Sequence, residues 1–443
     1  MVRHIPEEIP EEQLPRRRSP FSRRVRGLAM DTAPLQIASF RRLWTSTVVT
    51  SVGSQLTAVA VPLQIYDDTH SSVWVGVSGV VALVPLVVFA LWGGAIADMM
   101  DRRKLLLISN CGIAATSLLF WAQAAAGLHS VWVLMVLLGL QQGLFGINSP
   151  TRTASVARLV PPEQLPSATA LISTVTQLGQ IVGPMLAGVL VPVVGLSSLY
   201  LCDTIALCAT LWAVWQLPPL PPLGGVVRRA GLRDVVEGFR YLSTQRLLLV
   251  SFLADVIAMV FGMPRALFPQ MAQVDFGDPP GGGYALGVLY AAIPAGALLG
   301  GLLSGTFARV RRHGAMVVGA VCAWGLAVAV FGLSGPLWLA AVALAVAGAA
   351  DMVSMVFRGS ILQLAATDEM RGRMQGVFTV VVAGGPRLAD ALHGVTGSSI
   401  GPRATVTGGG LLVVLAMLAM ALAVPAFWRY RLATTPTEQI LEK

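Results

Sequence analysis

Long apolar runs alternate with short polar segments along most of this chain. A run of about 20 apolar residues is what a helix needs to cross the hydrocarbon core of a bilayer. Lipid offers no hydrogen bonds to the backbone, so such runs are expected to be helices rather than loops. The pattern predicts twelve membrane-spanning helices, at residues 44–65, 73–97, 104–127, 131–151, 168–193, 197–216, 247–272, 284–308, 314–333, 337–358, 374–396 and 404–428.

Positively charged residues flank these spans on alternate sides. Lys and Arg are concentrated in the N-terminal tail, in the even-numbered loops and at the C-terminus, whereas the odd-numbered loops contain only Arg403. Cytoplasmic loops of membrane proteins carry the excess of Lys and Arg. The distribution predicts a multi-pass protein of the inner or plasma membrane with both termini in the cytoplasm. It also requires an even number of spans.

Composition agrees with a membrane protein. Of the 443 residues, 55% are hydrophobic and 12% are charged, whereas a soluble chain carries about 25% charged residues. The net charge is +9, but most Arg residues flank apolar runs, so we expect anionic lipid at the cytoplasmic face as a partner and no nucleic acid. The cysteines lie within predicted spans and the histidines lack ligand spacing, so neither a disulfide nor a metal site is expected.

The longest internal loop divides the chain into two halves. It opens with the run from Pro218 to Pro222, a stiff spacer. Apolar residues then recur at helical spacing beside charged ones, which predicts a short amphipathic helix on the membrane surface. The expected segments are an Arg-rich, disordered tail at 1–42, a six-helix bundle at 43–217, the cytoplasmic linker at 218–246, a second six-helix bundle at 247–429 and a C-terminal tail at 430–443.

The two halves resemble each other at a separation near 206 residues. Arg152 precedes Glu163 by eleven positions, and Arg358 precedes Glu369 by the same number. Two further matches follow the same order: a glycine before a basic loop, and a Gly-Pro pair. We therefore expect an all-α membrane protein built from two pseudo-symmetric six-helix bundles, a known plan for transporters with a substrate site between the halves.

The end of the second span resembles the loop signature of the major facilitator superfamily. The matching residues are Gly94, Asp98, Arg102 and Arg103. The resemblance implies that Asp98 pairs with nearby Arg and with the N-terminus of the eleventh span, closing the cytoplasmic side as a latch. Met99 and Asp101 depart from the signature, which predicts a weaker or rearranged latch. The alternative is a simple hairpin that carries cytoplasmic positive charge.

The fifth span resembles the exporter signature of the same superfamily. The matching residues are Gly179, Gly183, Pro184 and Gly188. Glycines four residues apart allow two helices to approach closely, and proline bends the helix. The resemblance implies a position between the halves and an antiporter rather than an uptake carrier. The alternative is an ordinary packing face of small residues.

Charged residues inside the spans are candidates for coupling or for lining the cavity. They are Asp255, Asp351, Asp390, Arg265, Arg358 and Arg387. Charges at the bilayer centre are costly and must pair or face water. A buried carboxylate also binds a proton more readily than an exposed one, so the three acids are candidates for a coupling proton. Fixed ion pairs, such as Asp390 with Arg387 or Asp255 with Arg265, are the alternative; Asp203 and His393 are interpreted as structural.

Polar residues of the first half are mostly amides, which together with aromatic residues suit a cavity for a large amphiphilic ligand. The candidate cavity residues are Gln55, Gln64, Gln141, Asn148 and, in the second half, Tyr290.

Across nearly the whole membrane region the chain resembles the enterobactin-exporter branch of the superfamily and its actinobacterial multidrug-efflux relatives. The residues that carry this resemblance are Val61 to Ile65, Gly262 to Leu267, Leu289 to Pro294 and Gly384 to Arg387. It implies the major facilitator fold and proton-driven export of a siderophore-like or drug-like small molecule by alternating access, with no cofactor and with the monomer as the working unit. Uptake or facilitated diffusion of a small solute, or lipid translocation, are the alternatives. The sequence contains no nucleophile–base constellation, so an enzyme is not expected.

Overall fold

The structure is a computed structural model that describes residues 31–221, 232–307, 310–365 and 368–430. Within them, eleven helices are long and apolar enough to cross a membrane. A twelfth, α15 (Asp368–Ile400), is 33 residues long but more polar. At 1.5 Å per residue it measures about 50 Å, and it lies alongside α3, α9 and α16. The fold is therefore the expected one of twelve long helices.

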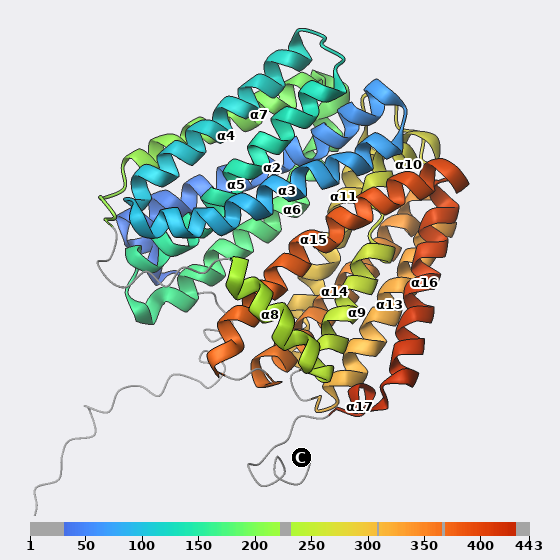
Figure 1. Cartoon of the computed structure of the whole chain (residues 1–443). Coiled ribbons are helices and arrows are strands. Elements are labelled where there is room, and N and C mark those ends of the chain that lie inside the picture. Colours follow the sequence, from blue (N-terminus) through green and yellow to red (C-terminus); the bar gives the residue numbers. More distant parts are fainter. Residues whose placement is uncertain (1–30, 222–231, 308–309, 366–367, 431–443) are drawn as a thin grey trace, which may run out of the picture.

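The first bundle contains six long helices and two short 3₁₀ turns, Ala33–Gln36 and Pro162–Gln164 (Figure 1). Its helices are α2 (Ala38–Thr69), α3 (Ser72–Met99), α4 (Arg102–Ala125), α5 (Val131–Leu159), α6 (Leu165–Val194) and α7 (Leu196–Trp215). α4 begins where the Asp101 carboxylate accepts hydrogen bonds from the amides of Arg103 and Lys104, a favourable N-cap.

The second bundle follows a short helix, α8 (Leu232–Thr244). Its elements are α9 (Arg246–Gly262), η4 (Arg265–Leu267), α10 (Phe268–Val274), α11 (Tyr284–Leu302), α12 (Ser304–Phe307), α13 (His313–Leu333), α14 (Leu337–Ala365), α15, α16 (Pro402–Ala423) and α17 (Pro425–Trp428). The seventh span is thus interrupted between α9 and α10, because Pro264 has no amide hydrogen to continue the helix.

Backbone geometry repeats between the bundles. Gly195 joins α6 to α7 with φ of 79°, and Gly401 joins α15 to α16 with φ of 89°. Positive φ values favour glycine because it has no Cβ. These glycines are 206 residues apart, the separation that the sequence repeat predicts, so equivalent helix pairs turn at equivalent positions.

The bundles meet along two helix pairs, α3 with α15 and α6 with α11. Figure 1 shows that they lie close together at the end that carries α10 and diverge toward the end that carries α8 and α17. At the α10 end, the backbones of Gly188 and Gly287 touch: a Cβ added to Gly287 would lie 2.7 Å from the Pro184 carbonyl oxygen. Contact between the halves therefore depends on residues without side chains.

Four sequence expectations need correction or limits. The first helix begins at Ala38 rather than at residue 44, so the tail ends before residue 42. The predicted span at 284–308 ends at Leu302 and is followed by α12. The amphipathic helix is present as α8, which packs on α9 and α15 with Leu242 buried; its place on a membrane surface stays a prediction. The predicted disorder of residues 1–30 and the tail at 431–443 lie outside the described residues.

Valine in place of Gly287 should separate the two bundles and destabilise the protein. The added atoms would collide with the Pro184 carbonyl and with Gly188 Cα, which would lie 3.1 Å from the new Cβ. Overpacking of this kind costs about 1–3 kcal/mol, measurable as a lower melting temperature of purified protein. Gly301→Val in the same helix is the control, since a Cβ there meets only Met352 Cε at 3.5 Å. Equal melting temperatures for the two variants would contradict the assignment.

Candidate functional site: buried charges and the contacts between the bundles

A buried ion cluster joins α9 and α14 in the second bundle. Arg358 Nη1 pairs with Asp255 Oδ1, and Arg358 Nη2 lies 3.8 Å from Asp351 Oδ1. Arg358 and Asp255 are 5% and 3% exposed, yet Arg358 Nε and Asp255 Oδ2 have no hydrogen-bond partner. The pairing of Asp255 with Arg265 considered from the sequence is therefore wrong. Two carboxylates share one cation, and the cluster has unused hydrogen-bonding capacity.

A second set of charges lies on α15, where it meets the first bundle. Arg387 Nη1 is 4.0 Å from Asp390 Oδ2, the pair considered from the sequence. Asp390 is 8% exposed, and its Oδ1 has no hydrogen-bond partner. Gly76 and Gly79 of α3 cover it so closely that a Cβ on Gly79 would lie 2.8 Å from Asp390 Cβ. The carboxylate is therefore enclosed by the other bundle and would lose this cover if the bundles separated here.

His393 connects α15 to the interruption in the seventh span. Its Nδ1 lies 2.8 Å from the Met263 carbonyl oxygen, and its Nε2 lies 3.1 Å from the Phe261 carbonyl oxygen. Both carbonyls lie beside Pro264, where the helical hydrogen bonds stop. A neutral imidazole donates from one nitrogen only, whereas an imidazolium donates from both. The geometry can accommodate the protonated ring.

Arg265 and Tyr290 lie close to the Arg387–Asp390 pair of α15. Arg265 is half-buried in η4, a segment that packs against α15 and α3. Tyr290 is 9% exposed and packs edge-to-face on Phe268. The structure does not bring Tyr290 together with the amide residues that the sequence grouped with it.

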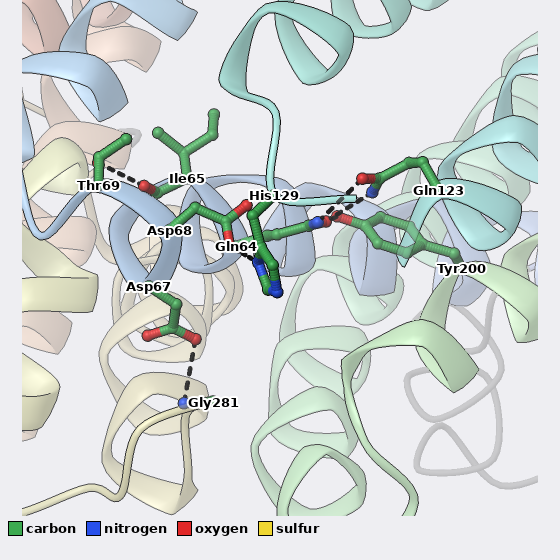
Figure 2. A network of polar contacts seen from close by, with 9 residues as sticks. All are labelled: Gln64, Ile65, Asp67, Asp68, Thr69, Gln123, His129, Tyr200 and Gly281. Carbon is green, nitrogen blue, oxygen red and sulfur yellow. Dashed lines mark hydrogen bonds and ion pairs between the residues drawn. The ribbon is translucent and has the colours of Figure 1, made fainter. Parts of the chain in front are cut away.

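The amides of the first bundle form hydrogen bonds with other polar side chains of the same bundle. Figure 2 shows Gln64 between Gln123 and Tyr200, with hydrogen bonds of 2.9–3.2 Å. Gln141 donates to Ser117, and Asn148 donates to Ser109. These contacts join α2, α4, α5 and α7 inside the bundle, so their described role is structural; a role in substrate binding stays a prediction.

Asp203 belongs to the same internal network. Its Oδ2 accepts hydrogen bonds of 2.7 Å from both Thr57 and Ser117. The side chain is 2% exposed, and these bonds tie α7 to α2 and α4. They are consistent with the structural interpretation made from the sequence.

The exporter signature lies at a junction of three helices. A Cβ on Gly179 would lie 2.8 Å from Ser51, and one on Gly183 would lie 2.4 Å from Gln55 Cβ, both in α2. Gln55 is half-buried at this contact. Gly188 touches α11 of the other bundle. The element therefore lies between the halves, as the resemblance implies.

The basic part of the latch signature binds its own bundle. Arg102 donates to the Ala154 carbonyl at 3.1 Å, and Arg103 donates to the Trp215 carbonyl. The surroundings of Gly94 and the side chain of Asp98 are outside what the structure describes. The pairing of Asp98 with the eleventh span therefore stays a prediction.

Polar contacts that the sequence did not reveal join the bundles at the α10 end. Asp67 Oδ1 accepts a hydrogen bond of 2.7 Å from Gln273, and its Oδ2 accepts one of 3.0 Å from the Gly281 amide (Figure 2). Ser72 donates to Gln270 at 2.7 Å. The only signal in the sequence is an acidic pair at the end of the first span, which does not specify a partner 206 residues away.

Beyond these contacts, α3 separates from the second bundle. A cavity of about 440 Å³ lies between α3, α9 and α15, and all of its lining residues are apolar or glycine; Leu83, Val256 and Gly385 represent the three helices. The bundles thus touch at the α10 end and leave space between them further along.

Comparison with known proteins agrees with this architecture. Residues 29–438 match the family described as transmembrane secretion effectors. The enterobactin exporter EntS of Shigella boydii serotype 18 is 31% identical over 394 residues, covering 87% of this chain and 92% of that protein. The chain belongs to the transmembrane secretion effector family of major facilitator transporters. It is a multi-pass membrane transporter and not an enzyme.

Other relatives extend the comparison. EntS of Escherichia coli O139:H28 is 31% identical over 391 residues, with the same coverage. Two solved transporters share the fold of this secretion effector. One is the nucleoside transporter NupG, with a TM-score of 0.68, 14% identity and coverage of 89% of this chain and 100% of that chain. The other is a bacterial homologue of the human lysosomal transporter Spinster, inward-facing and unoccupied, with a TM-score of 0.68, 14% identity and coverage of 91% and 100%.

Alanine in place of Asp67 should weaken the contact between the bundles. Hydrogen bonds to charged groups contribute about 1.5–3 kcal/mol, so we expect roughly a tenfold larger population with the α10 end separated. Spin labels at the exposed residues Leu128 and Tyr284, in a chain with its native cysteines replaced, would report this as a longer distance.

The neighbouring acid is a matched control for this experiment. Asp68 Oδ1 lies 2.6 Å from His129 Nδ1, within the first bundle (Figure 2). Asp68→Ala should therefore leave the distance between the labels unchanged. If both variants lengthen the distance equally, or neither does, Asp67 does not hold the two bundles together at the α10 end.

Proposed function

We propose that this transporter exports a siderophore-like small molecule from the cytoplasm in exchange for protons, by alternating access of its two bundles. The observation that carries the proposal is the 31% identity to enterobactin exporters along 87% of the chain. The position of the exporter signature between the halves agrees with it. In such a fold the substrate site lies near the midplane between the bundles.

The orientation of the chain in the membrane indicates which end of the bundles faces the cytoplasm. The excess of Lys and Arg in alternate loops supports a cytoplasmic position for both termini and for the α8 end of the bundles. On this assignment, the contacts of Asp67, Ser72 and Gly287 close the outer side. The diverging α8 end then faces the cytoplasm, where an exported molecule would enter. Anionic lipid would contact the basic residues at that face, and a single chain would suffice because it contains both bundles.

The proton gradient would supply the energy, with Asp390 as the primary proton-binding residue. Its carboxylate is covered by Gly76 and Gly79 of the other bundle, so separation of the outer ends would expose it to the outside. His393 lies three residues further along α15, where its ring nitrogens contact the Met263 and Phe261 carbonyls. Asp255 and Asp351, which share Arg358 between α9 and α14, are the other candidate acids.

The export function can be tested in cells. The chain should restore secretion of enterobactin by a bacterial strain that lacks its own exporter, measured by mass spectrometry of the medium. Secretion should fall when an uncoupler is added. Unchanged secretion despite the protein being present in the membrane fraction would refute the proposed cargo, and accumulation of enterobactin inside the cells would indicate uptake instead.

Asparagine in place of Asp390 or Asp255 should abolish energised transport but preserve folding. In everted vesicles with an imposed pH gradient, we expect enterobactin uptake to fall by about tenfold or more, whereas exchange of substrate without a gradient should persist for Asp390→Asn. Asp275→Asn is the control, because Asp275 pairs with Arg403 at 2.7 Å within the second bundle and is not one of the candidate proton-binding acids. Wild-type energised rates in both variants would remove the assignment of the proton site.

A further inference from the structure

Arg152 of α5 is a half-buried cation held by two hydroxyl groups of α2. Its Nη2 donates to Thr47 Oγ1 at 2.7 Å and, more weakly, to Ser46 Oγ at 3.4 Å. Both hydroxyls already donate to the Leu43 carbonyl, at 2.8 and 2.7 Å, so they present lone pairs to the guanidinium. The hydroxyls fix the position of the arginine, but they carry no charge to neutralise it.

No carboxylate compensates this charge. Among the residues that the structure describes, no Asp or Glu oxygen lies within 4.0 Å of the guanidinium of Arg152. Its Nε is buried and has no hydrogen-bond partner. An unpaired buried charge is costly and is normally retained for a function.

The equivalent position in the second bundle is neutralised. Arg152 and Arg358 are each the twenty-second residue of their helices, α5 and α14. Thr47 and Asp255 are each the tenth residue of theirs, α2 and α9. The pair Arg152–Thr47 therefore occupies the same helix positions as the pair Arg358–Asp255, with separations of 206 residues between the arginines and 208 between their partners. The same scaffold holds one arginine against a carboxylate and the other against a neutral hydroxyl.

The guanidinium remains accessible along one face of α5. Arg152 is half-buried, and Ser149 and Phe145, three and seven positions earlier on the same face, are exposed. α2 and α5 are the counterparts of α9 and α14, and transporters built on this plan bind their substrate between the two halves. A ligand in that space could reach the unused donors of Arg152.

We infer that Arg152 binds an anionic oxygen group, such as a carboxylate, on the exported molecule. This inference rests on the proposed export function and narrows its substrate class to molecules with an acidic oxygen, either a carboxylate or an ionised catechol hydroxyl of the kind that enterobactin carries. Arginine suits the task because its planar donors form paired hydrogen bonds with carboxylate oxygens. The phosphate of a lipid headgroup has the same chemistry, so the test must distinguish the two sources.

The test measures binding to the purified full chain in phosphatidylcholine nanodiscs at neutral pH. The probes are 2,3-dihydroxybenzoate, which carries a carboxylate, and catechol, which does not. Isothermal titration calorimetry measures the affinity for each probe. We expect the wild type to prefer 2,3-dihydroxybenzoate, and Arg152→Gln to reduce that affinity about tenfold without changing the affinity for catechol. Arg152→Lys should retain part of the preference.

A second variant keeps the inference testable if Arg152→Gln does not fold. Thr47→Asp would give Arg152 the carboxylate that Asp255 gives Arg358, and it should remove the preference while the arginine stays in place. Thr169→Asp, at an exposed position of α6, adds the same charge elsewhere in the bundle and should leave the preference intact. Arg158→Gln, whose Nη1 donates to the Pro221 carbonyl, controls for the loss of a nearby positive charge.

The two sources of the anion separate in a second lipid. The affinity for 2,3-dihydroxybenzoate should be unchanged in phosphatidylglycerol nanodiscs if the transported molecule supplies the group. A loss of affinity in these discs that is absent in Arg152→Gln would assign the site to lipid and overturn the inference. So would equal preference in the wild type and Arg152→Gln. If either result overturns the inference while the chain still secretes enterobactin, the proposed export function is retained without an anion site at Arg152.

Discussion

A polar group inside a bilayer must find its partner within the protein, because lipid offers none. This constraint explains both the helices and their exceptions. Where Pro264 interrupts the seventh span, the Phe261 and Met263 carbonyls lie against the ring of His393 on α15. The interruption thus persists because a neighbouring helix supplies the partner. The contact with His393 also connects α9 to α15, the helix that packs against the first bundle. The interruption therefore links the charged residues of the second bundle to the contact between the bundles.

The two bundles have the same skeleton but different polar interiors. The first bundle is held by neutral hydrogen bonds, such as those between Gln64, Gln123 and Tyr200. The second contains the ion cluster of Arg358 and the acid Asp390. Neutral hydrogen bonds change little with protonation, whereas a carboxylate that gains a proton loses its attraction to arginine. Under the proposed coupling, the acids that bind protons would lie in the second half, whereas Asp203 of the first half is held by the hydroxyls of Thr57 and Ser117.

Sequence reasoning predicted the helices because lipid, as the solvent, dictates their apolar pattern. It predicted the repeat because the spacing of Arg152 and Glu163 recurs in Arg358 and Glu369, and the equivalent turns at Gly195 and Gly401 agree with it. It grouped Gln64, Gln141 and Asn148 as cavity residues, but helix rotation decides which way an amide points, and composition does not encode rotation. It also suggested Arg265 for Asp255, whereas the partner is Arg358, 103 residues away. Pairings between distant helices depend on packing, so Asp67 with Gln273 could not be foreseen.

The contact between the bundles must be strong enough to close one side and weak enough to open again. Glycines on both sides, Gly188 with Gly287 and Gly76 beside Gly394, bring backbones together with little side-chain area. Few polar bonds are added, among them those of Asp67 and Ser72. Each such bond contributes on the order of 1–3 kcal/mol at most, which is comparable to the differential binding energy that shifts a two-state equilibrium. An interface built in this way suits the proposed mechanism, in which a substrate or a proton on Asp390 would open it, because either would need to outweigh only a few hydrogen bonds.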